Sequence, residues 1–129
     1  MRTIKFRGQD EDSKWLYGDL RQRMGYWPAI IESYCTEEGK VGYREIAVKE
    51  ETVGQFTGLK DKNGRDIYEG DILKAGSEKA KIEVRFVRGV FAFLWNGDLD
   101  DEFPCNAPTQ EWAEVVGNIH DNPKMIKRK

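Results

Sequence analysis

Two chain reversals and the start of a strand lie within the stretch Thr57-Gly-Leu-Lys-Asp-Lys-Asn-Gly-Arg-Asp-Ile-Tyr-Glu-Gly-Asp-Ile-Leu73. Asn63-Gly64 predicts a type I′ hairpin turn, because both residues tolerate the positive φ angles that this turn requires. Glu69-Gly70-Asp71 predicts a second reversal, which leads directly into the apolar pair Ile72-Leu73. These residues specify a backbone path, and none of them provides chemistry.

The N-terminal residues predict a hairpin. Residues 3–7 alternate between apolar and polar side chains, and residues 14–17 return as a second strand after a polar turn. We therefore expect a hairpin over residues 3–20, with a further turn beginning at Gly18-Asp19.

A second hairpin is expected before the central stretch. Residues 29–35 carry the β-branched and aromatic side chains that are typical of a strand, and residues 43–48 could pair back on them. A short strand is expected over residues 52–56, where Gly54 suggests a bulge or a close backbone approach.

The chain after the central stretch continues the β pattern. A period-two strand is expected after residue 79, with Ala80, Ile82, Val84 and Phe86 facing the core and Lys79, Lys81, Glu83 and Arg85 facing water. Arg88-Gly89 predicts a tight turn. Residues 90–95 are apolar on both faces and are expected in the centre of the sheet.

The C-terminal part is expected to hold a loop over residues 98–110 and a final strand over 111–116. Asn122-Pro123 could open a short C-terminal helix, since proline suits the first helical turn. Many short strands with frequent turns predict an all-β fold, a small barrel or sandwich. We expect a single domain over residues 1–129, with possible subdomains at 1–57 and 58–123 and a frayed basic tail at 124–129.

Composition restricts the classes of function. The formal net charge is −2, so the chain as a whole does not indicate a nucleic-acid or anionic-membrane partner. No apolar run approaches the roughly 20 residues that a membrane span needs, and the N-terminus lacks an apolar signal core. Cys35 and Cys105 are expected to be free thiols in a reducing cytoplasm, because two distant cysteines make neither a disulfide framework nor a zinc site.

Candidate chemical sites are weak. Residues 61–72 superficially resemble a calcium loop, but the ligand pattern fails, and the hairpin turn explains them better. The acidic cluster Asp98, Asp100, Asp101 and Glu102 could hold a cation, although a solvated loop is the favoured interpretation. His120 has no activated cysteine nucleophile in a recognisable motif. We therefore expect no catalytic residues, no cofactor and no metal site, and hence a protein that is not an enzyme.

A basic face is the best candidate for a ligand surface. Its possible nucleic-acid contacts are Lys79, Lys81, Arg85 and Arg88. Small β-barrels bind nucleic acid through basic grooves lined with aromatic rings. The rings that could stack bases are Trp15, Tyr17, Tyr26 and Trp27, and further positive charge comes from Lys5, Arg7, Arg21 and Arg23. Ordinary exposed charge, with the aromatic rings in the core, is the alternative.

The chain resembles the YopX-like proteins of bacteriophages and prophages. The resemblance rests on Ile4-Lys5-Phe6-Arg7 with Trp15-Leu16-Tyr17, on residues 52–72, and on Val115-Val116-Gly117-Asn118-Ile119-His120-Asp121-Asn122-Pro123. It implies an all-β fold with an SH3-like barrel element, in the cytoplasm of an infected or lysogenic bacterium. It implies no activity, cofactor or catalytic residue.

The function expected from these observations is a non-enzymatic binding module. It would engage a protein partner or assemble with itself, because exposed aromatic side chains mark an interface. The alternative is a nucleic-acid-binding accessory protein that uses the basic hairpin face around residues 79–88.

Overall fold

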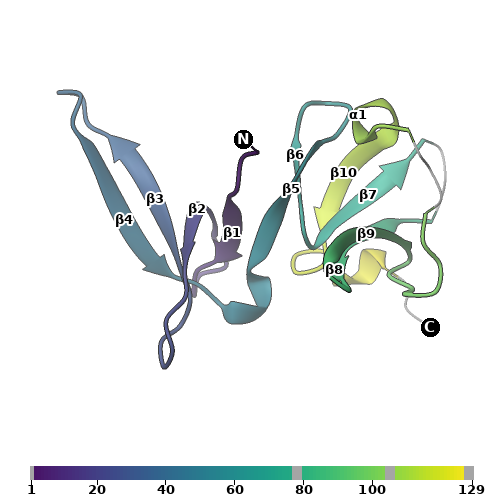
Figure 1. Ribbon diagram of the computed structural model, residues 1–129, viewed down its shortest axis with the longest axis horizontal. Coiled ribbons are helices and arrows are strands. Elements are labelled where there is room, and N and C mark those ends of the chain that lie inside the picture. The colour runs from purple at the N-terminus through teal and green to yellow at the C-terminus, as the bar shows by residue number, and fades with distance from the viewer. Residues whose placement is uncertain (1, 77–79, 104–106, 127–129) are drawn as a thin grey trace. The chain divides into compact units, whose positions relative to one another are not determined.

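The computed structural model describes residues 2–76, 80–103 and 107–126. The protein is all-β, as predicted, and its strands form antiparallel sheets with very little helix (Figure 1). The chain divides into two compact units, Met1–Phe56 and Thr57–Lys129, here called unit 1 and unit 2. No helix in the described part of the chain is long and apolar enough to span a membrane.

Unit 1 is a meander of antiparallel strands. In chain order its elements are β1 (Phe6–Gln9), β2 (Trp15–Arg21), β3 (Ala29–Cys35), β4 (Val41–Ala47), the 3-10 helix η1 (Glu50–Thr52) and the beginning of β5 (Gly54–Lys60). The hydrogen-bonded order is β4-β3-β2-β1-β5, which leaves β4 at the end of the series. Leu16, Ile30 and Val48 form the buried core, with Phe6, Leu20, Ile46 and Val53 packed around them.

Both hairpins that the sequence predicts in unit 1 are confirmed. β1 pairs with β2, and β3 pairs with β4 in an unbroken register from Ala29↔Ala47 to Cys35↔Val41. The turn expected at Gly18-Asp19 is wrong, because both residues lie inside β2. Gly18 is there for a different reason: a Cβ atom at this position would lie 2.1 Å from the carbonyl oxygen of Ile31 on β3.

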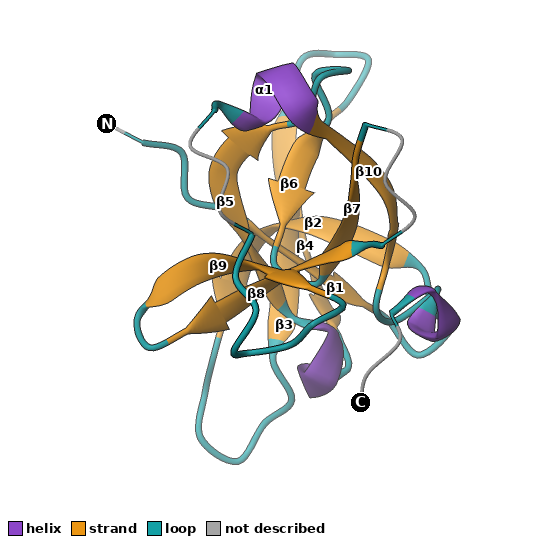
Figure 2. Cartoon of the chain, turned by 90° about the vertical axis from the view of Figure 1, so that its right-hand side faces the viewer, coloured by secondary structure: helices purple, strands orange, loops and turns teal. Residues whose placement is uncertain are grey.

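Unit 2 contains the rest of β5 and a second sheet. Its elements are β6 (Asp66–Tyr68), β7 (Asp71–Ala75), β8 (Ile82–Val87), β9 (Val90–Trp95), α1 (Thr109–Trp112), β10 (Ala113–Asn118) and η2 (Pro123–Met125). β7 to β10 form a four-stranded sheet in the order β10-β7-β8-β9, and Figure 2 labels these strands. The short C-terminal helix is a single 3-10 turn, and the final strand begins at Ala113 rather than at Glu111.

Aliphatic and aromatic side chains share the core of unit 2. Its buried members are Ile67, Leu73, Ile82, Val84, Ala113 and Val115. The rings of Phe93, Phe103 and Trp112 pack against this group, and the Phe103 and Trp112 centroids lie 4.5 Å apart. Because the rings come from β9, the following loop and α1, they tie the loop after β9 to the sheet.

Two predictions about the second sheet are wrong. β9 lies at the end of the strand order and not in the centre, although its apolar composition suggested a central strand. Its second apolar side is covered by ring contacts such as Phe93 with Trp112. The strict alternation expected along β8 also fails, because Glu83 is 1% exposed whereas Phe86 is 49% exposed.

The turns follow the glycine pattern of the sequence, with one correction. Arg88 and Gly89 both have positive φ between the paired residues Val87 and Val90, which is the two-residue turn expected there. At Asn63-Gly64 only the glycine has a positive φ, of 79°. The turn therefore begins two residues earlier, with the Gly64 amide donating to the Asp61 carbonyl oxygen over 3.0 Å. The type I′ prediction is wrong: this is a longer hairpin loop closed by a left-handed glycine.

Candidate functional site

The loop from β2 to β3 displays the most exposed aromatic pair in unit 1. The exposed fractions are 65% for Tyr26 and 63% for Trp27, and Met24 beside them is 98% exposed. A reversal brings these side chains out, because the Tyr26 amide donates to the Arg23 carbonyl oxygen and Gly25 takes a φ of 81°. We call residues 22–28 the aromatic loop.

The aromatic loop faces η1 across a concave surface, and the cavity that this surface encloses has a volume of about 690 Å³. This volume falls within the size range of ligand pockets in proteins, about 300–1,000 Å³. Its lining residues are Gln22, Arg23, Met24, Tyr26, Trp27, Pro28, Lys49, Glu50, Glu51 and Val53. All of them belong to unit 1, so this surface is complete within one compact unit.

Both walls of the concave surface are fixed by hydrogen bonds. The Arg21 guanidinium donates to the Trp27 carbonyl oxygen over 3.3 Å and forms an ion pair with Glu45 on β4. On the other side, the buried Thr52 hydroxyl donates to the Lys49 carbonyl oxygen and accepts the Gln9 amide. These contacts hold the backbone and leave the side chains of the aromatic loop facing solvent.

The charges around the concave surface are mixed. Arg23 lies over the Tyr26 ring, with its guanidinium carbon 5.5 Å from the ring centroid. The Lys49 ammonium group donates to the Ser13 hydroxyl over 3.0 Å. Glu50 and Glu51 are exposed in the first turn of η1. Aromatic rings bordered by charges of both signs are typical of a surface that binds another protein.

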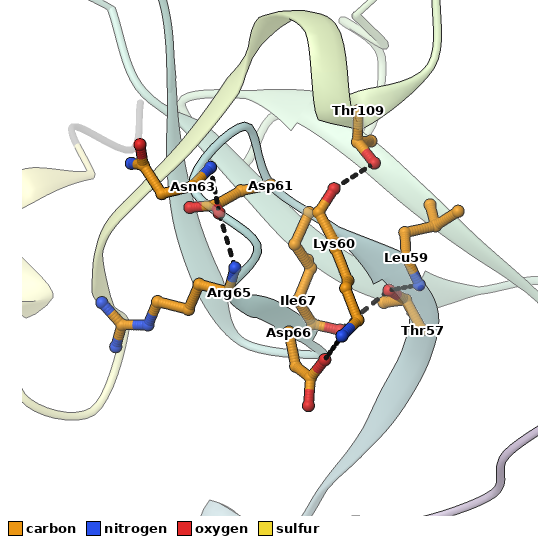
Figure 3. Close-up of polar contacts among 9 residues, drawn as sticks. All are labelled: Thr57, Leu59, Lys60, Asp61, Asn63, Arg65, Asp66, Ile67 and Thr109. Carbon is orange, nitrogen blue, oxygen red and sulfur yellow. Dashed lines mark hydrogen bonds and ion pairs between the residues drawn. The ribbon is translucent and has the colours of Figure 1, made fainter.

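The central stretch of sequence has a structural role, which Figure 3 shows in close-up. The Asp61 carboxylate accepts the amides of Asn63 and Arg65 through one oxygen, at 2.9 and 2.8 Å. Its other oxygen accepts the Val115 amide on β10 at 3.0 Å. Burial alone would raise the pKa of Asp61, but these amides, aided by the charge of Arg65, hold the pKa below its ordinary value. The carboxylate closes the turn and joins it to β10, a set of contacts that we call the Asp61 clasp. The calcium-loop alternative has no support in this geometry.

The hydroxyl groups of Thr57 and Thr109 make further contacts with the central stretch. Thr57 donates to the Ile67 carbonyl oxygen over 2.8 Å and also accepts the Leu59 amide (Figure 3). Thr109 at the start of α1 donates to the Lys60 carbonyl oxygen over 2.7 Å. The central stretch is therefore joined both to its own hairpin and to the segment before β10, which explains why it is rich in short polar side chains.

Only part of the predicted basic face is exposed to solvent with its charges unbalanced by a neighbouring carboxylate. Arg85 donates to the buried Glu83 carboxylate over 3.1 Å, so its charge is balanced within the sheet. Lys81 is half-buried, and Arg88 is exposed at the tip of the β8–β9 turn. Lys79 lies outside the described residues.

Several of the other predicted cations and rings contact one another. Arg7 is 3% exposed and lies over the Trp15 ring, with its guanidinium carbon 4.5 Å from the centroid. The Lys5 ammonium group lies 4.7 Å from the centroid of Phe56. Tyr17, by contrast, is 47% exposed. Of the four rings suggested as base-stacking groups, only Tyr26 and Trp27 are thus exposed beside each other.

The remaining candidates do not gather into a site. Asp98 accepts the Asp100 amide over 2.9 Å, which is the local turn contact typical of an aspartate in a loop. Within residues 2–76, 80–103 and 107–126, no group of three or more His, Cys, Asp or Glu side chains could hold a metal ion. The His120 amide donates to the Asn118 side chain, and Cys35 is an exposed free thiol. Cys105 lies outside the described residues.

Sequence reasoning named Tyr26 and Trp27 but missed the surface that they share with η1. Their signal was present: two adjacent aromatic residues follow Met24-Gly25, in a segment with no strand pattern to bury them. The sequence could not show that Glu50 and Glu51 line the same surface, because they are distant from Tyr26 and Trp27 in the chain and only the fold brings them near.

The comparisons with known proteins agree with this fold. A family model described as YopX protein matches residues 5–127. The crystal structure of protein EF1440 from Enterococcus faecalis is similar over 98% of this chain and 100% of its own, with a TM-score of 0.60 and 23% identity. At that identity the likeness shows the fold alone. No curated protein matches the chain.

Proposed function

This chain belongs to the YopX protein family, and we propose that it is a non-enzymatic binding module that engages a protein partner through the aromatic loop. The setting proposed for it is the cytoplasm of a bacterium that carries the gene in a phage or prophage genome. An SH3-like barrel element is part of the same proposal.

One observation carries the proposal: Tyr26 and Trp27 are both more than 60% exposed at the rim of a concave surface. Large rings in water are unfavourable unless a partner buries them, and Trp, Tyr and Arg are the side chains that dominate protein interfaces. The mixed charges of Arg23, Glu50 and Glu51 would form the polar rim of such an interface.

The test is partner capture with three immobilised proteins. They are the wild type, the double variant Tyr26→Ala/Trp27→Ala, and the control Phe86→Ala, which removes an exposed ring from unit 2. Nuclease-treated lysate of the lysogenic host is passed over each, and a retained protein is then purified and titrated by calorimetry. Since central aromatic residues contribute about 2 kcal/mol or more, the double variant should bind at least about 30-fold more weakly than the wild type and the control.

Retention of the same proteins by all three would overturn the proposal. The same experiment also separates the alternative function. Retention that is seen only with untreated lysate, and that returns when DNA or RNA is added to the nuclease-treated lysate, would put nucleic-acid binding in place of protein binding.

A further inference from the structure

The outer edge of β4 presents backbone groups that no described residue pairs. Thr36 donates to the Lys40 carbonyl oxygen at the tip of the β3–β4 hairpin, and Val48 donates to the Pro28 carbonyl oxygen at its base. In an antiparallel ladder, hydrogen-bonded pairs alternate with non-hydrogen-bonded pairs. Residues 42, 44 and 46 therefore bond to β3, and the amide and carbonyl groups of Val41, Tyr43, Glu45 and Ala47 point away from it.

β4 carries few of the features that keep edge strands from pairing. Natural edge strands carry charged side chains, above all lysine, or proline or a bulge, or are very short, and of these β4 has only the charges of Arg44 and Glu45. β4 has seven residues, Val41-Gly-Tyr-Arg-Glu-Ile-Ala47, with no lysine or proline and no break in its register. By contrast, β9 is partly covered by the Phe103 and Trp95 amide contacts, and β10 by the Val115 amide bond to Asp61.

The distal half of the hairpin also lacks a third strand. β2 pairs with β3 only over Ala29, Ile30 and Ile31, so residues 32–35 and 41–44 form a two-stranded ribbon. Figure 1 shows β3 and β4 continuing past the end of β2. Val41 and Tyr43 in this ribbon are 65% and 70% exposed. An isolated two-stranded ribbon is marginally stable in water, and additional strands stabilise it.

We propose that β4 pairs with β4 of a second copy of this chain, antiparallel, around a two-fold axis at Tyr43. The pairing would join the two ribbons into one four-stranded sheet, β3-β4-β4-β3. This inference rests on the proposed function only in that self-assembly is one form of protein binding, and it uses a surface other than the aromatic loop.

Symmetry and charge disfavour two registers at the centre of β4 and favour the one between them and Gly42. A two-fold axis perpendicular to the sheet places one residue opposite its own copy. Centring the pair on Arg44 or Glu45 would place like charges directly opposite each other, which is unfavourable. Centring it on Tyr43 instead pairs two tyrosine rings and lets Val41, Tyr43 and Glu45 bond to Glu45, Tyr43 and Val41 of the second copy.

The absence of a side chain at Gly42 leaves room for the Tyr34 ring in this arrangement. A Cβ atom at Gly42 would lie 2.4 Å from the Tyr34 ring, which covers it from β3. In the Tyr43-centred register, Arg44 of the second copy lies opposite Gly42 and therefore near this ring. Tyr34 already contacts Arg44 of its own chain, at 4.9 Å, so a second guanidinium on its other side would be a further cation–π contact.

The first test is the oligomeric state by sedimentation equilibrium, at protein concentrations from about 1 to 200 µM, which covers the micromolar affinities expected of a weak specific complex. We expect a monomer–dimer equilibrium that Tyr43→Lys weakens at least about tenfold, because a lysine at the edge opposes strand pairing. Val90→Lys, at a similarly exposed residue of β9, is the matched control and should leave the dimer unchanged. A wild type that stays monomeric throughout overturns the inference.

The second test reads the register directly. In a background with Cys35→Ser and Cys105→Ser, single cysteines are introduced by Val41→Cys, Tyr43→Cys and Glu45→Cys. A hydrogen-bonded pair has Cα atoms about 5.5 Å apart, within the range of a disulfide, so only Tyr43→Cys should form a covalent dimer on mild oxidation. Cross-linking at Val41 or Glu45 but not at Tyr43, or dimerisation without any of these cross-links, would overturn the register.

Folding and partner binding are followed separately. Circular dichroism and thermal unfolding of each variant show whether a lost dimer reflects a lost fold. If Tyr43→Lys is a monomer that still captures a protein through the aromatic loop, the proposed function holds without β4 pairing. If the wild type forms the dimer but captures no partner, β4 pairing holds and partner binding by the aromatic loop does not.

Discussion

Asp61 accepts a hydrogen bond of 3.0 Å from the backbone amide of Val115, across 54 positions of sequence. The same carboxylate closes the hairpin turn through Asn63 and Arg65. One buried side chain therefore joins the central stretch to the last strand, and its contact with the Val115 amide is itself buried.

Replacing Asp61 by alanine should destabilise unit 2 strongly. The change leaves the buried Val115 amide without its acceptor, which costs about 1–3 kcal/mol, and it also removes the part-buried contacts to the Asn63 and Arg65 amides. We expect Asp61→Ala to lower the free energy of unfolding by roughly 3 kcal/mol, measured by urea denaturation. The control Lys62→Ala changes an exposed side chain in the same turn and should stay within about 0.5 kcal/mol. Equal stability of the two variants would contradict the clasp.

Stability should also depend on pH through Asp61. Its pKa is lower in the folded protein than the ordinary value of 3.8, so the folded state favours the charged form. The resulting stabilisation is fully present above the unfolded pKa and is lost as pH falls through the folded pKa. Urea denaturation between pH 6 and about pH 2.5 should therefore show a decline in the wild type below about pH 4 that is shallower in Asp61→Asn. Parallel curves for both proteins would show that other carboxyl groups cause the decline.

Local features of this fold were predictable from the sequence. The turn at Arg88-Gly89 and the pairing of residues 29–35 with the following strand depend on neighbouring residues, and both are present. The loop 22–28 could be recognised as aromatic, but its position opposite η1 could not. Local patterns are informative because they reflect backbone sterics and side-chain period, which act over a few residues.

Two of the errors concern contacts between residues that are distant in sequence. Gly18 looked like a turn residue because glycine is common in turns, but here it makes room for the backbone of Ile31. Glu83 looked solvent-facing because it alternates with Ile82 and Val84, yet it is buried with Arg85 as an ion-pair partner. Ile31 is distant from Gly18 in sequence, and Ile72 and Leu94, which flank Glu83 in the sheet, are distant from Glu83.

Gly18→Ala should destabilise unit 1. The added Cβ atom would lie 2.1 Å from the Ile31 carbonyl oxygen, and this neighbour is backbone, so β2 and β3 must separate. We expect a loss of about 2 kcal/mol or more, since overpacking costs about 1–3 kcal/mol even where side chains can adjust. Hydrogen exchange should show the loss of protection at Ala29 and Ile31, whose amides face β2. Asp19→Ala, at the exposed neighbouring position, is the control, and similar exchange in both variants would refute the close approach.

Arg85 and Arg88 should differ in their effect on stability. Removing Arg85 leaves the buried Glu83 carboxylate without the guanidinium that lies 3.1 Å away, and breaking a buried pair in this way costs about 3–5 kcal/mol when both charges are fully buried. Because Arg85 is partly exposed, we expect a smaller loss for Arg85→Ala, roughly 1–2 kcal/mol in thermal or urea unfolding. Arg88→Ala, at the turn tip, should change stability by less than about 0.5 kcal/mol. A reversed order would mean that the Glu83 charge is compensated elsewhere.

Nucleic acid should bind only weakly to the wild-type protein. The net charge is −2, and Arg85 is balanced by Glu83 within the sheet, so the basic hairpin face has few cations to displace counterions from phosphate. Fluorescence anisotropy with single- and double-stranded DNA and RNA, repeated over a salt series, should give dissociation constants no tighter than those of non-specific binding, about 10⁻⁴–10⁻⁶ M. Arg88→Glu and Lys81→Glu should each change these values by less than about threefold, since one phosphate contact among many weak ones is a small part of the affinity. Arg88→Glu is the cleaner of the two, because its exposed position keeps charge reversal from disturbing the sheet. Tight binding by the wild type that falls steeply with salt and is lost in both variants would make the basic hairpin face the functional surface.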